Sequence, residues 1–507
     1  MAHTFALWSL IWQSSPYLLT TGLILIVLHT AYTFIYNIFF HPLRSFPGPK
    51  LAAATSLYYA TWSMRGKRHT LDEQLHAKYG QVVRIKPNQL SFIGENCWKD
   101  IYMHRQGHPQ MAKFNRGGAN KKGAYSIINA PDDVHARQRK GLSHAFSEKA
   151  LREQEPLIKL YIDLLVSNMR EDAREGRPSN MALYFNWTTF DIVGDLSFAQ
   201  SFDALRTRTT HPWIKAFFSG LNLFVILSEL GNITVLRPIV MLFVLAFRSG
   251  TRQKVVREFC DKAVKKRSES GDLDRPDFLG KVLYQNSEKD EKAMMSDEEI
   301  RLTFNILMIA GSETTATLLA GCTYLLQRNP KVLEKLNAEV RSAFESEDDI
   351  TMVKVNTLPY LLAVIEEALR LYPPVPVALS RVTPPEGTTI CGYHVPGKVV
   401  VGIPQWAAGV SPEHFVDSHE FIPERFLPNK DEKFNDDRKA VLQPFSAGPR
   451  NCLGRNLAYA EMKLILARII FNFDLQLVDK ELKWMEQQKV YVLWQKPELM
   501  VKVNERA

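Results

Sequence analysis

One short loop near the C-terminus constrains this 507-residue chain more than any other stretch: FSAGPRNCLG, from Phe445 to Gly454. Its two glycines allow a tight turn and let the backbone approach a flat ligand closely. The helix expected from Arg455 to about Phe471 points its positive end at Cys452 and favours the thiolate form. Arg450 offers a planar, permanently charged donor to an anionic group. A buried structural cysteine is the simpler alternative for such a thiol.

A second constraint is a long helix, expected from the capping-box start at Ser296 to about Arg328. Midway it carries the run Ala310 to Thr315, AGSETT, in which Gly311 costs the helix roughly 1 kcal/mol relative to alanine. Thr314 can hydrogen-bond back to a carbonyl or to a ligand, which loosens the helix locally. A buried helix whose glycine admits a neighbouring side chain explains the same residues.

A shorter helix is expected from Pro359 to Leu371 and ends at a Pro-Pro pair. On this helix Arg370 shares a face with Glu367, three residues earlier, and with Glu366, four residues earlier. The spacing alone does not choose between these two pairs. Exposed helices carry many such pairs, so the motif by itself indicates little.

These segments together resemble the cytochrome P450 monooxygenases from about Pro47 to the end of the chain. The loop fits F-x-x-G-x-R-x-C-x-G, the long helix fits (A/G)-G-x-(D/E)-T, and Glu367 with Arg370 fits E-x-x-R. The resemblance implies heme b with Cys452 as the iron ligand. It also places around the heme the loop residues Phe445, Arg450 and Gly454.

The resemblance also implies catalytic and structural roles. Thr314 would steer protons to bound oxygen, with Glu313 as an acidic relay, so these two are the expected catalytic residues. Glu367 and Arg370 would form a buried structural cluster with Arg425, beneath the heme.

Further residues are expected at the heme edge and above it. A helix is expected to begin at Asp132, and His135 and Arg139 lie four apart on it and share a face. By resemblance, His135, Arg139 and Arg381 would meet the heme propionates, and residues 375–378 would face the substrate. The neighbouring cations Arg137 and Lys140 are expected on a solvated basic face; the alternative is that they help to receive an acidic reductase.

The N-terminal segment predicts a membrane anchor. From Tyr17 to Phe40 the chain is almost wholly apolar, long enough as a helix to cross the roughly 30 Å hydrocarbon layer. No Lys or Arg precedes it, which argues against a cleaved signal peptide. The first cation is Arg44, just after the span, which places the body in the cytosol. We therefore expect a single-pass anchor over residues 1–44, with its helix at about 17–40, and a monooxygenase domain over 45–507.

The remaining sequence predicts a mainly α fold with small β-sheets, the P450 architecture. Strands are expected at 82–85, 89–93 and within 388–403. The apolar region 216–247 predicts two helices, each too short to cross a membrane, that roof an apolar pocket with Phe217, Phe218 and Phe224. Five scattered cysteines fit a reducing compartment with one functional thiol and no disulfide framework. The net charge of +9 is spread along the chain, so it does not indicate a nucleic-acid partner.

The expected function follows from the implied ligand, since a thiolate donates electron density to iron and favours O–O cleavage. We expect one oxygen atom from O2 to enter a lipophilic secondary metabolite, a terpenoid or polyketide, at the endoplasmic reticulum membrane. Residues 185–191 and 135–147 resemble fungal members of this kind. Electrons would come from NADPH through cytochrome P450 reductase, with cytochrome b5 as a second candidate partner.

Two alternatives stay open at this stage. One is a heme-thiolate isomerase or dehydratase that does not use O2, against which the intact Glu313-Thr314 pair weighs. The other is a non-enzymatic membrane heme protein, which would show six-coordinate iron with two protein ligands.

Overall fold

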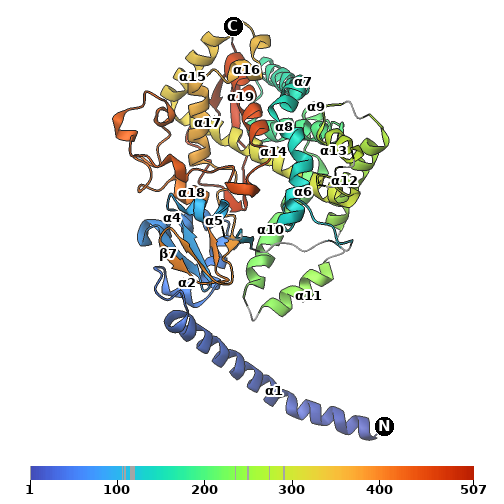
Figure 1. Cartoon of the computed structure of the whole chain (residues 1–507), viewed down its shortest axis with the longest axis vertical. Coiled ribbons are helices and arrows are strands. Elements are labelled where there is room, and N and C mark those ends of the chain that lie inside the picture. Colours follow the sequence, from blue (N-terminus) through green and yellow to red (C-terminus); the bar gives the residue numbers. More distant parts are fainter. Residues whose placement is uncertain are drawn as a thin grey trace.

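The computed structural model describes residues 2–506, except 106, 108–109, 115–119, 121, 234–235, 248–250, 273–274, 289 and 291. For residues 2–16, 18–19, 217–219, 243–247 and 251–257 it describes the backbone alone. The described chain is mainly helical with four small sheets, which confirms the expected fold class. One long apolar helix extends from the body at the N-terminal end, and the C-terminus lies at the opposite end (Figure 1).

The N-terminal rod is the helix α1, Ala2–Ile35, which continues as a π-helical turn over Tyr36–Phe40. Its segment Thr20–Phe40 is long and apolar enough to cross a membrane, with a mean hydropathy of 1.8. This agrees with the predicted span. Asn37, at the body end of the rod, is buried and donates to the carbonyl of Ala54 at 3.0 Å. The Asn37 carbonyl in turn accepts from Arg84 at 2.9 Å, so hydrogen bonds fix where the rod meets the body.

The largest sheet has five strands in the order β1-β2-β8-β5-β3. β1 (Val82–Lys86) and β2 (Gln89–Phe92) form the expected antiparallel pair, and β8 (Val400–Gly402) lies parallel to β2. β5 (Arg381–Val382) and β3 (Ala112–Lys113) complete the sheet. The smaller sheets consist of β4 (Ser179–Asn180), β9 (Phe473–Leu477) and β12 (Met500–Glu505); β6 (Thr388–Ile390) and β7 (Tyr393–Val395); and β10 (Lys489–Tyr491) and β11 (Leu493–Gln495).

Helices make up the rest of the body. Besides α14 they are α2 (Lys50–Ala54), α3 (Leu57–Met64), α4 (Arg68–Tyr79), α5 (Cys97–Tyr102), α6 (Asp132–Ser143), α7 (Glu148–Arg174), α8 (Met181–Phe198), α9 (Ala204–Thr207), α10 (Pro212–Gly231), α11 (Arg237–Phe247), α12 (Thr251–Glu269), α13 (Phe278–Ser287), α15 (Pro330–Ala343), α16 (Met352–Val355), α17 (Pro359–Leu371), α18 (Gln405–Gly409) and α19 (Arg455–Asn472). Most of their apolar side chains join one large core cluster. The helices α2, α4, α5 and α18 lie beside the strands (Figure 1).

The spine of this core is α14, Asp297–Arg328, as the sequence predicted. Its capping box is present, because the Ser296 side chain accepts from the backbone N–H of Glu299 while the Glu299 carboxylate accepts from the N–H of Ser296. α14 packs most extensively against α8. A Cβ at Gly311 would lie 2.8 Å from Cγ2 of Val193, so the mid-helix glycine is needed for this close approach. This contact agrees with the simpler interpretation of Gly311, a glycine in a buried helix that admits a neighbouring side chain.

The region after α9 differs from the prediction. α10 has 20 residues and is long and apolar enough to cross a membrane, so the expectation of two pieces too short to do so is wrong for this helix. Nevertheless α10 packs against α12 and α3, and Glu229 near its end forms an ion pair of 2.6 Å with Lys86 of β1. In Figure 1, α10 and α11 lie toward the end of the body from which α1 extends.

The cysteines also differ from the prediction in one respect. Cys97 of α5 and Cys391, between β6 and β7, form a disulfide with their Cα atoms 5.6 Å apart. They are separated by 294 positions, so the pairing depends on tertiary contacts that sequence spacing does not carry. Cys260 and Cys322 are buried thiols, and burial raises the pKa of each to about 12.

Candidate active site

A cavity of about 360 Å³ lies between α14, the start of α19 and the loop that precedes α19. Seven of the residues singled out from the sequence line it: His135, Arg139, Thr314, Phe445, Arg450, Cys452 and Gly454. Chain segments more than 300 residues apart thus line the same cavity. The sequence motifs had indicated each of these segments separately. Glu313 and Arg381 are not among its lining residues.

The sulfur loop is held in shape by backbone contacts. The N–H of Cys452 donates to the carbonyl of Phe445 at 2.8 Å and closes the loop. Gly448 has φ +73°, and a Cβ there would lie 2.0 Å from the carbonyl oxygen of Tyr102. Gly454 is different, since a Cβ there would meet no described protein atom nearer than 3.9 Å, at Phe146. The first glycine is therefore required by the fold, whereas the second leaves the cavity wall open.

The thiol of Cys452 is exposed to this cavity. Burial away from bulk water raises its pKa, and the Gly454 N–H and the guanidinium groups of Arg139 and Arg455 act in the opposite direction. Groups that favour the thiolate are therefore present, as the sequence predicted for the start of α19, but burial has the larger effect on the pKa of Cys452. A metal cation bound to sulfur stabilises the thiolate directly. The site thus suits a metal-bound sulfur better than a free thiolate.

Arg450 has the geometry expected of an anion ligand. Its side chain is 2% exposed and donates to Asp132 at 2.6 Å and to the carbonyl of Ala130 at 2.7 Å. Its Nη1 is buried and has no hydrogen-bond partner among the described residues. A buried guanidinium N–H without an acceptor is costly, so the position favours an additional anionic oxygen.

His135 and Arg139 lie beside this arginine on α6. Burial, and then the charges of Arg450 and Arg139, lower the pKa of His135 to about 4. Arg139 donates to the backbone carbonyl of Asn451 at 2.7 Å and to its side-chain oxygen at 2.5 Å. Arg139 therefore ties α6 to the sulfur loop, in addition to lining the cavity. A nearby cation that the sequence reasoning missed is Lys113, which also lines the cavity and lowers the pKa of His135.

Two predicted site residues lie elsewhere. Glu313 is buried and forms an ion pair with Lys496, and it accepts from the Thr317 hydroxyl at 3.3 Å. Arg381 is buried in β5, where its guanidinium carbon lies 5.4 Å from the ring centroid of Tyr102. Neither the relay role of Glu313 nor the propionate role of Arg381 follows from these positions, and both remain predictions.

Thr314 behaves as the sequence suggested. Its hydroxyl donates to the carbonyl of Ala310 at 2.6 Å, and the hydroxyl of Ser312 donates to the carbonyl of Met308 at 2.6 Å. Such bonds back to the preceding turn compete with the regular helical ladder and mark a place where a helix bends readily. Thr314 thereby presents its side chain at the cavity wall.

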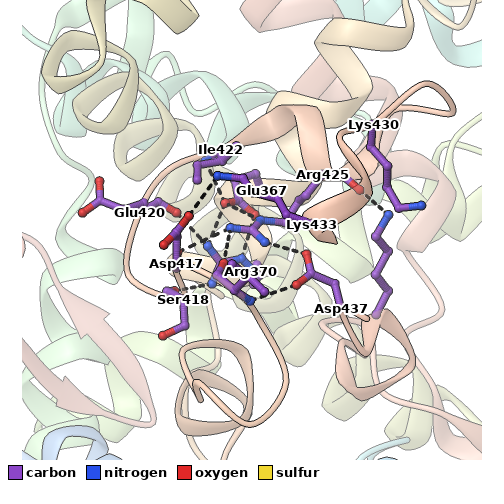
Figure 2. A network of polar contacts seen from close by, with 12 residues as sticks. Glu367, Arg370, Asp417, Ser418, Glu420, Ile422, Arg425, Lys430, Lys433 and Asp437 are labelled. Atoms are coloured by element: carbon purple, nitrogen blue, oxygen red, sulfur yellow. Dashed lines mark hydrogen bonds and ion pairs between the residues drawn. The ribbon is translucent and has the colours of Figure 1, made fainter. Parts of the chain in front are cut away.

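Figure 2 shows the buried cluster around Glu367. Arg370 donates to the two carboxylate oxygens of Glu367 at 2.7 Å each, and Arg425 donates to the same carboxylate at 3.1 Å. All three side chains are fully buried. Arg425 also pairs with Asp437 at 2.5 Å, a partner that the sequence reasoning missed. Glu366 instead accepts from Tyr459 at 2.7 Å, so the structure resolves the alternative that spacing left open.

The basic residues of α6 correct another expectation. Arg137 is only partly exposed, at 28% of its side chain, and pairs with Glu299 of α14 at 2.6 Å, so it is not a free solvated cation. Lys140 remains about half exposed and pairs with Asp290 at 2.8 Å. Only Lys140 keeps the predicted character of a solvated cation.

Apolar side chains form the rest of the cavity wall. Among them are Ile306 and Leu307 of α14, Phe278 of α13, and Val375 and Leu379 of the segment before β5. Val375 was expected to face the substrate.

The predicted roof residues differ from that wall. Phe224 is 63% exposed and does not line the cavity, so its expected place in the roof is wrong. The side chains of Phe217 and Phe218 lie outside the described part of the chain.

Comparison with known proteins decides the family. The Cytochrome P450 family model matches residues 47–503. The chain belongs to the cytochrome P450 family. It is 42% identical over 487 residues to cytochrome P450 monooxygenase astA of Talaromyces wortmannii, covering 95% of this chain and 96% of that relative. It is 41% identical over 479 residues to the trichothecene C-4 hydroxylase of Trichoderma arundinaceum, covering 93% and 94%. It is 39% identical over 504 residues to cytochrome P450 monooxygenase aclL of Aspergillus oryzae, covering 98% and 99%.

Membership makes this P450 an oxidoreductase of the monooxygenase type and implies a heme-thiolate cofactor. The cavity fits that group on three observations. A thiol enters the cavity at Cys452, the buried Nη1 of Arg450 lacks an acceptor, and the wall at Gly454 is open. These features match, in order, an iron ligand, an anionic propionate and a flat ring.

Proposed function

We propose that this P450 is a membrane-anchored monooxygenase of fungal secondary metabolism that oxidises a lipophilic terpenoid or polyketide. Heme b, held by Cys452, would supply the chemistry that activates O2. Electrons come from NADPH through cytochrome P450 reductase, with cytochrome b5 as a further donor. The observation that carries the proposal is the convergence of Cys452, Thr314 and Arg450 on one largely apolar cavity.

Each residue at the site has a definite task in this proposal. Cys452 binds the iron, and Arg450 and His135 hold the propionates, with Arg139 tying α6 to the sulfur loop between them. Thr314 orients protons toward the oxygen side of the cavity with its hydroxyl. Phe445 and Gly454 shape the space for the ring. Glu313 supplies protons to Thr314 once its ion pair with Lys496 opens.

The apolar wall supports a lipophilic substrate. Ile306, Leu307, Val375 and Phe278 offer no charge to a small polar acid, and apolar surface in a concave pocket favours a bulky apolar ligand. One relative's name specifies hydroxylation of a trichothecene at C-4. For this chain the substrate is proposed only as a class.

The anchor and the exposed face of α10 and α11 support a site on the endoplasmic reticulum membrane. Large apolar side chains are exposed there at Phe224, Ile239, Met241 and Leu242. With the Thr20–Phe40 span they give one end of the protein an apolar character. A substrate dissolved in lipid could then enter without crossing water.

The test combines a spectrum with product analysis. The full chain is expressed in a eukaryotic host together with cytochrome P450 reductase, and the reduced membranes are treated with carbon monoxide. We expect the absorption band of a thiolate-bound heme, and oxidised products that depend on NADPH. Cys452→Ser should abolish both, whereas Cys322→Ala, at a buried thiol of α14 that does not line the cavity, should retain them. A Cys452→Ser variant that still oxidises substrate would refute the proposal.

A further inference from the structure

A buried acid that no part of the proposed function uses faces the same cavity. Glu461 lies on α19, nine positions after Cys452, and is 1% exposed. The residue lines the cavity, and neither of its carboxyl oxygens has a hydrogen-bond partner among the described residues. A buried polar group in that state requires an explanation, because it loses its hydration without compensation.

Thr315 of α14 also lines the cavity, and its hydroxyl is the polar group that acts on Glu461. The hydroxyls of Ser312 and Thr314 donate to carbonyls of their own helix, whereas the Thr315 hydroxyl lies close enough to the Glu461 carboxyl group to oppose the rise of its pKa. A hydroxyl group of α14 and a carboxyl group of α19 thus lie near each other where the two helices pack together.

No cation of the described residues forms an ion pair with Glu461. Burial raises its pKa to about 8, and the Thr315 hydroxyl is the only group that opposes the shift. Several charged side chains on α19 and on the elements packed against it have other described partners: Glu313 with Lys496, Glu366 with Tyr459, Lys463 with Asn356, Arg468 with Asp163 and Glu347, Arg341 with Asp474, and Lys354 with Asp349. An isolated buried carboxyl of this kind holds its proton at neutral pH.

We propose that Glu461 is a positioning residue: as a neutral carboxylic acid it donates a hydrogen bond to Thr315 and so fixes α19 to the oxygen-activating turn of α14. The two helices carry the residues on which turnover depends, because α19 follows directly on Cys452 and Thr315 follows Thr314. The contact therefore sets the spacing between the sulfur loop and the Thr314 hydroxyl. Glu461 itself exchanges no proton with the substrate.

Ionisation of Glu461 reverses the roles in this contact. A carboxylate can only accept, so the Thr315 hydroxyl must turn toward it, and the new charge draws water into a cavity that is otherwise mostly apolar. Water there would supply the two protons with which O2, reduced by two electrons from NADPH, leaves as hydrogen peroxide and does not oxidise the substrate. With the pKa near 8, roughly one-tenth of the molecules are ionised at about pH 7 and roughly nine-tenths at about pH 9. Coupling of electron use to product should fall across that range.

The test uses the full chain with bound heme and compares Glu461→Gln, Glu461→Leu and Thr315→Val. Gln is uncharged and can donate to Thr315, whereas Leu cannot. The first readout is infrared absorption at neutral pH. The carbonyl stretch of a protonated carboxylic acid should be present in the natural protein and absent in Glu461→Gln. This readout does not depend on substrate or turnover, so it distinguishes failure of this inference from failure of the proposed monooxygenase function.

The second readout is the pH profile of coupling, the ratio of product to NADPH consumed. The natural protein should lose coupling at least about two-fold between about pH 7 and about pH 9. Glu461→Gln should keep the neutral-pH value at both, and Glu461→Leu and Thr315→Val should be low and independent of pH. A purely structural role predicts lower heme content with no pH inflection. An ionised Glu461 at neutral pH, or equal coupling in the Gln and Leu variants, would overturn the proposal.

Discussion

Glu313 and Lys496 form a buried ion pair, with side chains 7% and 4% exposed, that joins α14 to the segment after β11. The Lys496 ammonium also donates to the Thr317 hydroxyl at 2.7 Å, one turn along α14. The acid of the Thr314 motif is thus turned away from the cavity and held by a cation near the C-terminus. The motif identifies the acid, but its partner sets the direction in which it points.

We expect Lys496→Met to lower the free energy of unfolding by about 3–5 kcal/mol, because it leaves the Glu313 carboxylate buried without a partner. Glu313→Gln should cost a comparable amount for the converse reason. The double variant should recover most of the loss, since no unpaired buried charge remains. Denaturant unfolding of the detergent-solubilised chain provides the measurement. Lys433→Met is the control, because its pair with Asp417 is about half exposed at both ends and should contribute less than about 1 kcal/mol.

The elements of this fold with strong local signals were predictable. α14, α17 and α19 begin and end within a residue or two of the expected positions, because capping residues and prolines at helix ends act locally. The loop with Cys452 was likewise recognised, from its resemblance to the family motif F-x-x-G-x-R-x-C-x-G.

Features that depend on tertiary contacts were not predictable. The choice between Glu366 and Glu367 requires knowing which face of α17 is buried. The cysteine pair and the Lys496 partner of Glu313 each join segments more than 180 residues apart, and no local pattern records them. Arg137 was expected in solvent because its helix is polar, yet Glu299 of α14 covers it.

Glu367→Gln tests the choice that the structure makes between the two acids. It leaves Arg370 and Arg425 buried and short of one negative charge, and we expect a loss of about 3–5 kcal/mol and poor heme incorporation. Glu366→Gln is the matched control, one position away on the same helix. It keeps an acceptor for the Tyr459 hydroxyl and should cost about 1 kcal/mol or less. Similar losses in the two variants, measured by unfolding and by the ratio of heme to protein, would contradict the assignment.

The two loop glycines should respond differently to alanine. Gly448→Ala places an alanine at a position with φ +73°, in the left-handed region. Its Cβ would lie 2.0 Å from the carbonyl oxygen of Tyr102, so the loop must distort. We expect a loss of at least about 1–2 kcal/mol together with loss of heme. Gly454→Ala meets no described protein atom within 3.9 Å, so the heme-free protein should keep its stability. Its heme affinity should fall, because the added methyl group occupies the open wall. Equal stability loss in the two heme-free variants would contradict this distinction.

His69 should make the stability of the protein depend on pH. Its ring lies between Trp406 and Trp494, with centroids 5.1 and 4.8 Å away, and burial lowers its pKa to about 3. In the unfolded chain its pKa is about 6.5, so the unfolded state binds the extra proton between these values and stability rises with pH there. The slope from this residue approaches about 1.4 kcal/mol per pH unit. His69→Phe keeps the ring and should remove that slope in unfolding measurements between about pH 5 and about pH 6.5.

His419 supplies a control of opposite sign. It pairs with Glu73 at 3.0 Å, and this hydrogen bond raises the pKa of His419. The folded state therefore binds its proton more tightly, and its contribution is present below about pH 6.5 and lost as the pH rises through the raised value. His419→Gln should change stability only slightly, because the side chain is 60% exposed, and mainly below about pH 7. A slope below about pH 6.5 that survives in His69→Phe would mean that another buried histidine dominates, with His76, whose pKa is also lowered to about 4, as the next to replace.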